Sequence, residues 1–414
     1  MSNSDIKISI LAYVESQFKY LASKGKCSGG WLRFQKVLMA SNKENIQHHL
    51  IEFKPELQNP LAFGIFDILV SMILAFIQAT KVIKQKNVHF IISPTEVPQA
   101  IILSYLSSKI TGRRFVAFLN SVPCYGLVDV QIVGKSDGKP SYKSLFRVMK
   151  GARKLRLRAI LEALVWNITF KMLDSPSTHI ICLSPVVADE LSKLGLKGRI
   201  VSVYPGNGIN YNDISSVTPE VDEKKYDAIY AAGNFYPQKG IFDAVKIWGN
   251  VIKKNPEAKL AIAGVVHDKS PFVIDELNNL IRDLGLHRNV SIICDPFKGM
   301  AQKELWKEMK RSKIFLYPSR KDVWPLVIGE ALACRLPVIA YDLPGIKYAY
   351  GDCPAVCLQN VGDVEGAAKT MIRLLSDDSL LRNLSHKARQ YAENHTWTHV
   401  VELERKAYLA ILES

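Results

Sequence analysis

The sequence predicts an α/β protein of two domains, each built on a parallel sheet. The chain has 414 residues, enough for two domains of about 200 residues that each bury a core. Near-continuous apolar runs, typical of strands covered on both faces, alternate with helix-like stretches in two successive series. A polar break at residues 210–225 separates the two series.

The apolar runs fix the order of the expected strands. Those of the first series begin at Ile6, His89, Phe115, His179 and Ile200, and those of the second at Tyr226, Lys259, Val290, Lys313 and Pro337. Such alternation predicts two Rossmann-like domains, with a ligand crevice where the strands end. We place the first domain at residues 1–210 and the second at residues 218–390.

Composition narrows the class of protein. Charged residues make up 22% and hydrophobic residues 48%, which is ordinary for a folded protein. Seven cysteines at irregular spacing favour a reducing compartment over a disulfide framework. The N-terminus lacks the features of a signal peptide, so we expect a cytoplasmic protein. A net charge of +15 suits nucleic acid, an anionic membrane surface or a phosphorylated substrate.

The most apolar stretch, residues 60–80, is long enough to span a bilayer. It contains Asp67 and Gln78, however, and strand and helix patterns continue on both sides of it. We therefore expect a helix packed within the first domain.

A basic segment covers residues 143–171. Arg147, Lys150, Lys154 and Arg158 recur at helical spacing, and no acidic residue lies between Lys143 and Arg158. The segment is either a helix on an anionic membrane surface or a domain helix with a solvated charged edge. No nucleic-acid recognition motif accompanies the charge, so nucleic acid is not expected as a partner.

Two carboxylates, Asp322 and Glu330, lie eight positions apart across a loop and a helix-like segment. Eight helical residues rise about 12 Å, close to the distance between the sugar and the ribose of a nucleotide sugar. One loop-helix unit could therefore hold both ends of such a molecule.

The stretch from Tyr317 to Ala340 resembles the signature of the retaining family 4 glycosyltransferases (glycosyl transferases group 1). Asp322, Glu330 and the strand start at Pro337 follow that signature, although the family usually has Glu at the position of Asp322. The resemblance implies the GT-B fold, in which two Rossmann-like α/β/α domains face each other across a cleft. It also implies that Glu330 binds the ribose, that Asp322 contacts the donor sugar, and that a final helix, at about 391–414, completes the first domain.

A second resemblance lies between Gly233 and Gly240. Lys239 matches the family's phosphate-binding lysine, and Asn234 stands where the family has an arginine at the donor site. The alternative is that Lys239 and Gly240 form an ordinary turn before a helix. No Asp-x-Asp triplet occurs in the chain, so we expect metal-independent catalysis and no cofactor, with lysine, backbone amides and helix N-termini stabilising the leaving diphosphate.

Backbone amides are expected at two further places. Gly29 and Gly30 match the family's glycine loop, where the absence of side chains lets amides approach a phosphate. An isolated Gly-Gly pair is more often a flexible turn. Because Pro325 has no N–H, Leu326 or Val327 would supply the amide that follows Asp322.

Many members of the family place a histidine after the fourth strand of the first domain, where this chain has Asn120. An asparagine could hydrogen-bond a sugar hydroxyl but cannot act as a base. In that case the leaving phosphate would take the proton of the acceptor.

We therefore expect a retaining glycosyltransferase that moves a sugar from a nucleotide-sugar donor to a glycan or lipid-linked acceptor. Peripheral attachment to the cytoplasmic face of a membrane is part of this expectation. Two alternatives stay open: a sugar-nucleotide epimerase on the same two-domain fold, and a non-catalytic protein that binds a glycan or a lipid surface. An epimerase needs an acid and a base near the sugar, and the first domain offers no obvious histidine or carboxylate pair.

Overall fold

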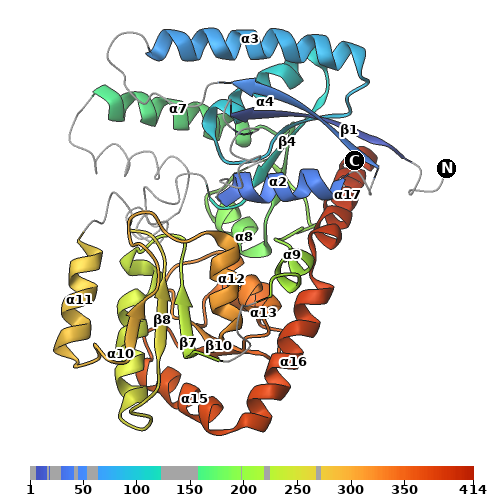
Figure 1. Ribbon diagram of the computed structural model, residues 1–414. Coiled ribbons are helices and arrows are strands. Elements are labelled where there is room, and N and C mark those ends of the chain that lie inside the picture. The colour runs from blue at the N-terminus through green and yellow to red at the C-terminus, as the bar shows by residue number, and fades with distance from the viewer. Residues whose placement is uncertain are drawn as a thin grey trace. The chain divides into compact units, whose positions relative to one another are not determined.

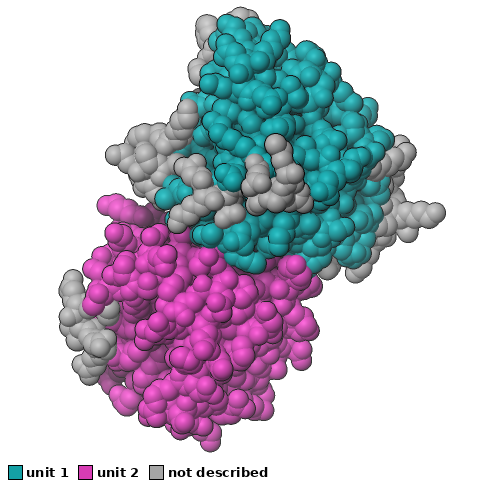
Figure 2. All heavy atoms as spheres, turned by 90° about the vertical axis from the view of Figure 1, so that its right-hand side faces the viewer, with its two compact units in different colours: residues 1–206, 397–414 teal, residues 207–396 magenta. Residues whose placement is uncertain are grey.

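In a computed structural model, the chain forms two compact units (Figures 1 and 2). Unit 1 comprises residues 1–206 and 397–414, and unit 2 comprises residues 207–396. The structure describes residues 6–15, 18, 29–41, 45–53, 64–122, 157–196, 198–218, 224–266 and 272–414. Each unit contains one parallel sheet flanked by helices, as the sequence predicts.

The sheet of unit 1 has the strand order β2-β1-β3-β4-β5-β6, and all of its pairings are parallel. Its strands are β1 (Ile8–Glu15), β2 (Ile46–Phe53), β3 (Phe90–Ser93), β4 (Arg114–Leu119), β5 (Thr178–Cys182) and β6 (Arg199–Ile200). The helices in its described residues are α2 (Gly29–Ser41), α3 (Gly64–Gln85), α4 (Pro98–Thr111), α7 (Leu157–Leu173), α8 (Pro185–Lys193) and α17 (Trp397–Glu413).

The sheet of unit 2 has the order β12-β11-β10-β7-β8-β9, again with parallel pairings. Its strands are β7 (Tyr226–Ala231), β8 (Leu260–Ala263), β9 (Val290–Ile292), β10 (Ser312–Tyr317), β11 (Val338–Tyr341) and β12 (Val356–Gln359). Its helices are α9 (Tyr211–Ser215), the 3-10 helix η1 (Pro237–Lys239), α10 (Ile241–Ile252), α11 (Val273–Asp283), α12 (Gln302–Lys310), α13 (Leu326–Ala333), α14 (Pro344–Tyr350), α15 (Val364–Ser376) and α16 (Asp378–Asn394).

Each sheet has an edge strand that the sequence analysis missed. The strand β2 carries His48 and His49, which interrupt its apolar run, and β12 has only four residues. Both lie first in the strand order of their sheets. Edge strands pair on one side only, so they need less apolar sequence than central strands.

The helix expected at about 391–414 is two helices. The helix α16 ends at Asn394 and α17 begins at Trp397. The break coincides with the boundary between the units, and at this point the His395 ring stacks on Tyr391 with 3.8 Å between centroids. The helical prediction failed here because apolar periodicity continues through a short change of direction.

The apolar run at 60–80 gives α3, a helix packed within unit 1, as predicted. Its residues Ala75, Ala79 and Ile83 are buried in one cluster with Leu11 of β1 and residues of α4. Within the described part of the chain, no helix combines the length and apolarity needed to cross a membrane.

The basic segment 143–171 lies largely outside the described residues. The helix α7 begins at Leu157, and its side chains are described only from Leu164 onward. The charged positions on which the membrane prediction rested are therefore untested.

The last helix, α17, covers the face of the unit 1 sheet opposite α3. The Tyr408 ring contacts Phe90 of β3 at 5.3 Å, whereas the next residue, Ile91, belongs to the cluster on the α3 side. Successive residues of a strand point to opposite faces. An ion pair of 2.5 Å joins Arg33 of α2 to Glu404 of α17, with both side chains only 4% exposed.

This buried pair gives a test of how α17 is held. The Glu404→Ala substitution leaves the Arg33 charge buried without its partner, so we expect the free energy of unfolding to fall by about 3–5 kcal/mol. Urea denaturation measures the change. The control Glu402→Ala alters an exposed residue of the same helix and should cost no more than about 0.5 kcal/mol. Equal losses in the two variants would contradict this account of the pair.

Candidate functional site

The strand order of unit 2 locates a crevice at the carboxyl ends of β7 and β10. From β7 the chain proceeds to β8 and β9 on one side, and then returns to β10 on the other side of β7. Loops that leave two such neighbouring strands diverge, and ligands of open α/β sheets bind between them. Lys239 follows β7 and Asp322 follows β10, so both lie in these loops.

Lys239 and Asp322 are joined directly. The Lys239 Nζ lies 2.5 Å from Asp322 Oδ2, with the two side chains 27% and 13% exposed. Asp322 Oδ2 also accepts a hydrogen bond of 2.8 Å from the Tyr317 hydroxyl, and its Oδ1 accepts one of 3.0 Å from the Val323 amide. In the structure the predicted phosphate lysine and the predicted sugar carboxylate are thus partners of each other.

Two buried tyrosines form the floor beneath this pair. The rings of Tyr230 and Tyr317 stack with 6.4 Å between centroids, and the Tyr230 hydroxyl donates to the Lys239 carbonyl at 3.2 Å. Burial raises the pKa of Tyr317 well above its usual value, and the charge of Asp322 raises it further. The Tyr317 hydroxyl therefore stays protonated and donates to the carboxylate.

Gly240 lets the two loops approach each other closely. Its φ is +78°, and a Cβ at this position would collide with the Pro318 carbonyl. Across the same contact the Arg320 amide donates to the Gln238 carbonyl at 2.8 Å. The alternative expectation, that Lys239 and Gly240 form a turn before a helix, is confirmed. The same turn also places Lys239 in contact with Asp322.

A second ion pair, which the sequence analysis missed, holds the loop after β10. Arg320 Nη2 lies 2.7 Å from Asp243 Oδ2 of α10, and the Tyr341 hydroxyl donates to the same oxygen at 3.1 Å. Asp243 is buried. The one sequence signal was an aspartate on the otherwise apolar buried face of α10.

The loop between Asp322 and α13 corrects the spacing argument. The helix begins only at Leu326, after Pro325, so helical rise separates Leu326 from Glu330 by about 6 Å and does not extend back to Asp322. Trp324 packs against Tyr348 and Tyr350, at 5.9 and 6.3 Å between ring centroids. These contacts give the indole a packing role.

Glu330 and the first turn of α13 lie next to this loop. Glu330 is partly exposed and accepts a hydrogen bond of 3.0 Å from Gln302 Nε2. Leu326 and Val327 occupy the first two positions of the helix, where backbone N–H groups have no partner within the helix. Asn234 is exposed in the loop after β7, and its carbonyl accepts from the Tyr236 amide at 3.0 Å.

In unit 1, the paired glycines open α2 and do not form a loop before it. The helix starts at Gly29. A Cβ on Gly30 would lie 2.6 Å from Asn120 Nδ2 and 3.1 Å from Thr95 Cγ2. Close packing against the ends of β3 and β4 therefore explains this glycine without a ligand.

The same place contains a carboxylate that the sequence analysis passed over. Glu96 Oε1 accepts from the Ser121 amide at 2.5 Å, and Glu96 Oε2 accepts from Asn120 Nδ2 at 3.4 Å. Burial raises the pKa of Glu96, and these donors act in the opposite direction. Its position three residues after the end of the buried strand β3 was the signal that could have identified it.

A family model matches a large part of unit 2. Residues 215–394 match the family model described as glycosyl transferases group 1. The chain is 30% identical over 159 residues to the N-acetyl-alpha-D-glucosaminyl L-malate synthase of Bacillus anthracis, covering 38% of each protein. Across the curated relatives compared, the match spans between 15% and 61% of the relative.

Solved structures resemble nearly the whole chain. The sucrose-phosphate synthase of Thermosynechococcus elongatus aligns with a TM-score of 0.63 at 14% identity, over 98% of this chain and 99% of the other. HepE of Anabaena, solved in complex with UDP, aligns with a TM-score of 0.60 at 14% identity, over 99% and 100%. The chain therefore has the two-domain α/β fold of the GT-B glycosyltransferases, and within it residues 215–394 are similar to the glycosyl transferases group 1 model.

Proposed function

We propose that the protein is a retaining, metal-independent glycosyltransferase that moves a sugar from a nucleotide-sugar donor to a glycan or lipid-linked acceptor. The observation that carries the proposal is the pairing of Lys239 with Asp322 at the switch point of a group 1 domain, beside Glu330 and the start of α13. A similar structure contains UDP, so UDP-sugars are the first donors to test.

In this proposal the donor changes the partners of Lys239. The diphosphate replaces Asp322 as the partner of the ammonium, and the amides of Leu326 and Val327 at the N-terminus of α13 bind phosphate oxygens. Asp322 keeps its donors Tyr317 and Val323, so the carboxylate remains fixed. The oxygen that Lys239 leaves can then accept a hydrogen bond from a hydroxyl of the donor sugar.

Glu330 binds the ribose hydroxyls in the proposal. Its present partner, Gln302, is a neutral amide that ribose hydroxyls can replace. Asn234 and the amides of Gly29 and Gly30 are weaker candidates for donor contacts. Asn234 carries no charge, and packing alone accounts for Gly30.

Bond making and breaking need no base from the protein. The bond from the anomeric carbon to the phosphate oxygen breaks, and the acceptor oxygen bonds to that carbon on the same face. The acceptor proton passes to the leaving phosphate oxygen. Two observations support this arrangement. The Asn120 side chain is an amide and cannot act as a base, and the Glu96 carboxylate already accepts hydrogen bonds from Ser121 and Asn120.

Removal of Glu330 tests the nucleotide end of the site. In Glu330→Ala, loss of hydrogen bonds to a charged acceptor should lower kcat/KM for the donor by about 10- to 100-fold, mostly through KM. Transfer is measured with a panel of UDP-sugars and with the fold checked by circular dichroism. The control Glu304→Ala removes an exposed glutamate of α12. Full activity in folded Glu330→Ala would refute this role, and an isomerised donor in the absence of acceptor would identify an epimerase.

Removal of Lys239 tests the stabilisation of the leaving group. In Lys239→Ala the charge that develops on the diphosphate loses its cation, so we expect kcat to fall by about 10²- to 10³-fold. Asp322 retains two donors, so the thermal midpoint should change little. Lys246→Ala, on the next helix, is the control. A variant whose KM rises with kcat unchanged would show that Lys239 binds ground state and transition state equally.

Glu96 is proposed as a positioning residue for Asn120. Glu96→Gln keeps the size of the side chain but replaces one acceptor oxygen with a donor, so the Asn120 and Ser121 contacts cannot both persist. We expect KM for the acceptor to rise about tenfold, the equivalent of one hydrogen bond, with KM for the donor unchanged. Equal changes in both KM values would indicate a general structural role.

A further inference from the structure

The helix α3 has two apolar faces, and only one is buried. One face packs on the sheet through Ala75, Ala79 and Ile83. The opposite face exposes a continuous set of large aliphatic side chains, each between 37% and 60% exposed: Leu69, Val70, Ile73, Leu74 and Ile77. A helix on the surface of a globular protein normally carries polar residues on its outer face. The apolar outer face therefore indicates a partner.

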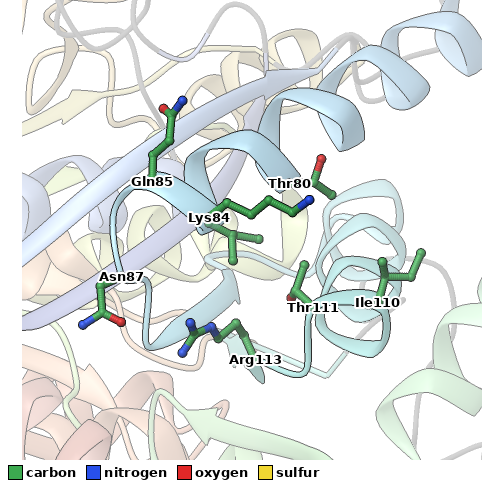
Figure 3. A pocket seen from close by; sticks show the side chains of 8 residues that line it. Thr80, Lys84, Gln85, Asn87, Ile110, Thr111 and Arg113 are labelled. Atoms are coloured by element: carbon green, nitrogen blue, oxygen red, sulfur yellow. The ribbon is translucent and has the colours of Figure 1, made fainter.

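The apolar surface continues onto α4. Leu106 and Ile110 of that helix are 42% and 69% exposed. Ile110 borders the same pocket as Thr80 and Lys84 of α3, so the surfaces of the two helices are contiguous (Figure 3). In the described part of unit 1, the exposed large apolar side chains lie on α3, α4 and α7, with the exception of Met39.

A basic pocket closes one end of this surface. It has a volume of about 640 Å³ and is lined by Thr80, Ile83, Lys84, Gln85, Asn87, Ile110, Thr111 and Arg113. Two of these residues are cations, four are neutral polar residues, and the lining contains no carboxylate. Figure 3 shows the Lys84 side chain extending between Thr80 and Thr111, with Arg113 below it. Among the described residues, neither Lys84 nor Arg113 forms an ion pair with a carboxylate.

The cations beside the apolar face favour an anionic partner. Lys81 and Lys84 lie on the same side of α3 as Ile73 and Ile77, because positions four, seven and eight apart share a helix face. A second copy on this face would bring like charges together in a chain of net charge +15. An anionic bilayer instead offers acyl chains to the aliphatic residues and phosphates to the lysines.

We propose that the outer face of α3 and α4 binds the surface of an anionic bilayer. The aliphatic side chains enter the boundary between headgroups and acyl chains, and the pocket between Lys84 and Arg113 takes a lipid phosphate. The proposal uses residues outside the basic segment 143–171 and does not depend on the transferase activity. A protein held in this way has direct access to acceptors that are themselves in the membrane.

Vesicle flotation of the full chain tests the proposal. The wild type should float with vesicles that contain phosphatidylglycerol and less so with phosphatidylcholine alone, and salt should weaken the binding. Ile73→Ser combined with Ile77→Ser should abolish flotation. Lys84→Gln combined with Arg113→Gln should weaken binding to the anionic vesicles about 10- to 30-fold, since each cation near the surface contributes about one decade or less. Transfer to a soluble acceptor should be unchanged in both.

Matched controls lie in unit 2. Phe297→Ser removes an exposed aromatic side chain, and Lys254→Gln removes an exposed cation. Neither should alter flotation. Wild type that ignores the vesicles, or controls that lose binding as much as the α3 variants, would overturn the proposal. The proposal would also be overturned if inorganic phosphate stabilised the wild type, but not the variant of Lys84 and Arg113, and the wild type did not bind vesicles. Sedimentation that showed a dimer lost in the Ile73 and Ile77 variant, again without vesicle binding, would assign the face to self-association.

Discussion

The ion pair between Lys239 and Asp322 is the interaction around which the candidate site of unit 2 is arranged. It joins the loops that leave β7 and β10, which the strand order would otherwise send apart. Gly240 makes the pair possible because a side chain there would strike the Pro318 carbonyl. Tyr317 and the Val323 amide hold the carboxylate from the other side. The loops are therefore fixed before any ligand arrives, which lowers the entropic cost of binding a charged substrate.

The central strands and most of the helices could be predicted because their apolar runs carry the whole signal. The edge strands could not, because β2 contains adjacent histidines and β12 is short. The break after Asn394 also escaped prediction, since residues 391–414 have helical periodicity on both sides of it. Pairing with a neighbouring strand forms β2 and β12, and at the break the Ile209 amide donates to the His395 carbonyl at 2.8 Å, so contacts distant in sequence accompany the first and last of these features.

The candidate site, like the fold, has features that the sequence could predict and features that it could not. Lys239, Asp322 and Glu330 could be selected from motifs, and the topology brings the first two together. Their pairing, however, depends on a loop whose helix starts four residues later than spacing alone suggested. The Arg320–Asp243 pair and the contacts of Glu96 with Asn120 and Ser121 span 77 and about 25 positions. No short motif records such contacts, so sequence reasoning passed over them.

The apolar run of α3 is easily recognised in the sequence, but its role depends on what each face of the helix contacts. Apolar residues all around a helix are typical of a membrane span or of a helix buried on every side. Here one face packs on a sheet, and the other remains exposed beside lysines. Burial against the sheet excludes a span, since a helix cannot pack across a bilayer and on a sheet with the same residues. The exposed face then has to be explained by a partner at the surface, and the position of the cations makes an anionic one the consistent choice.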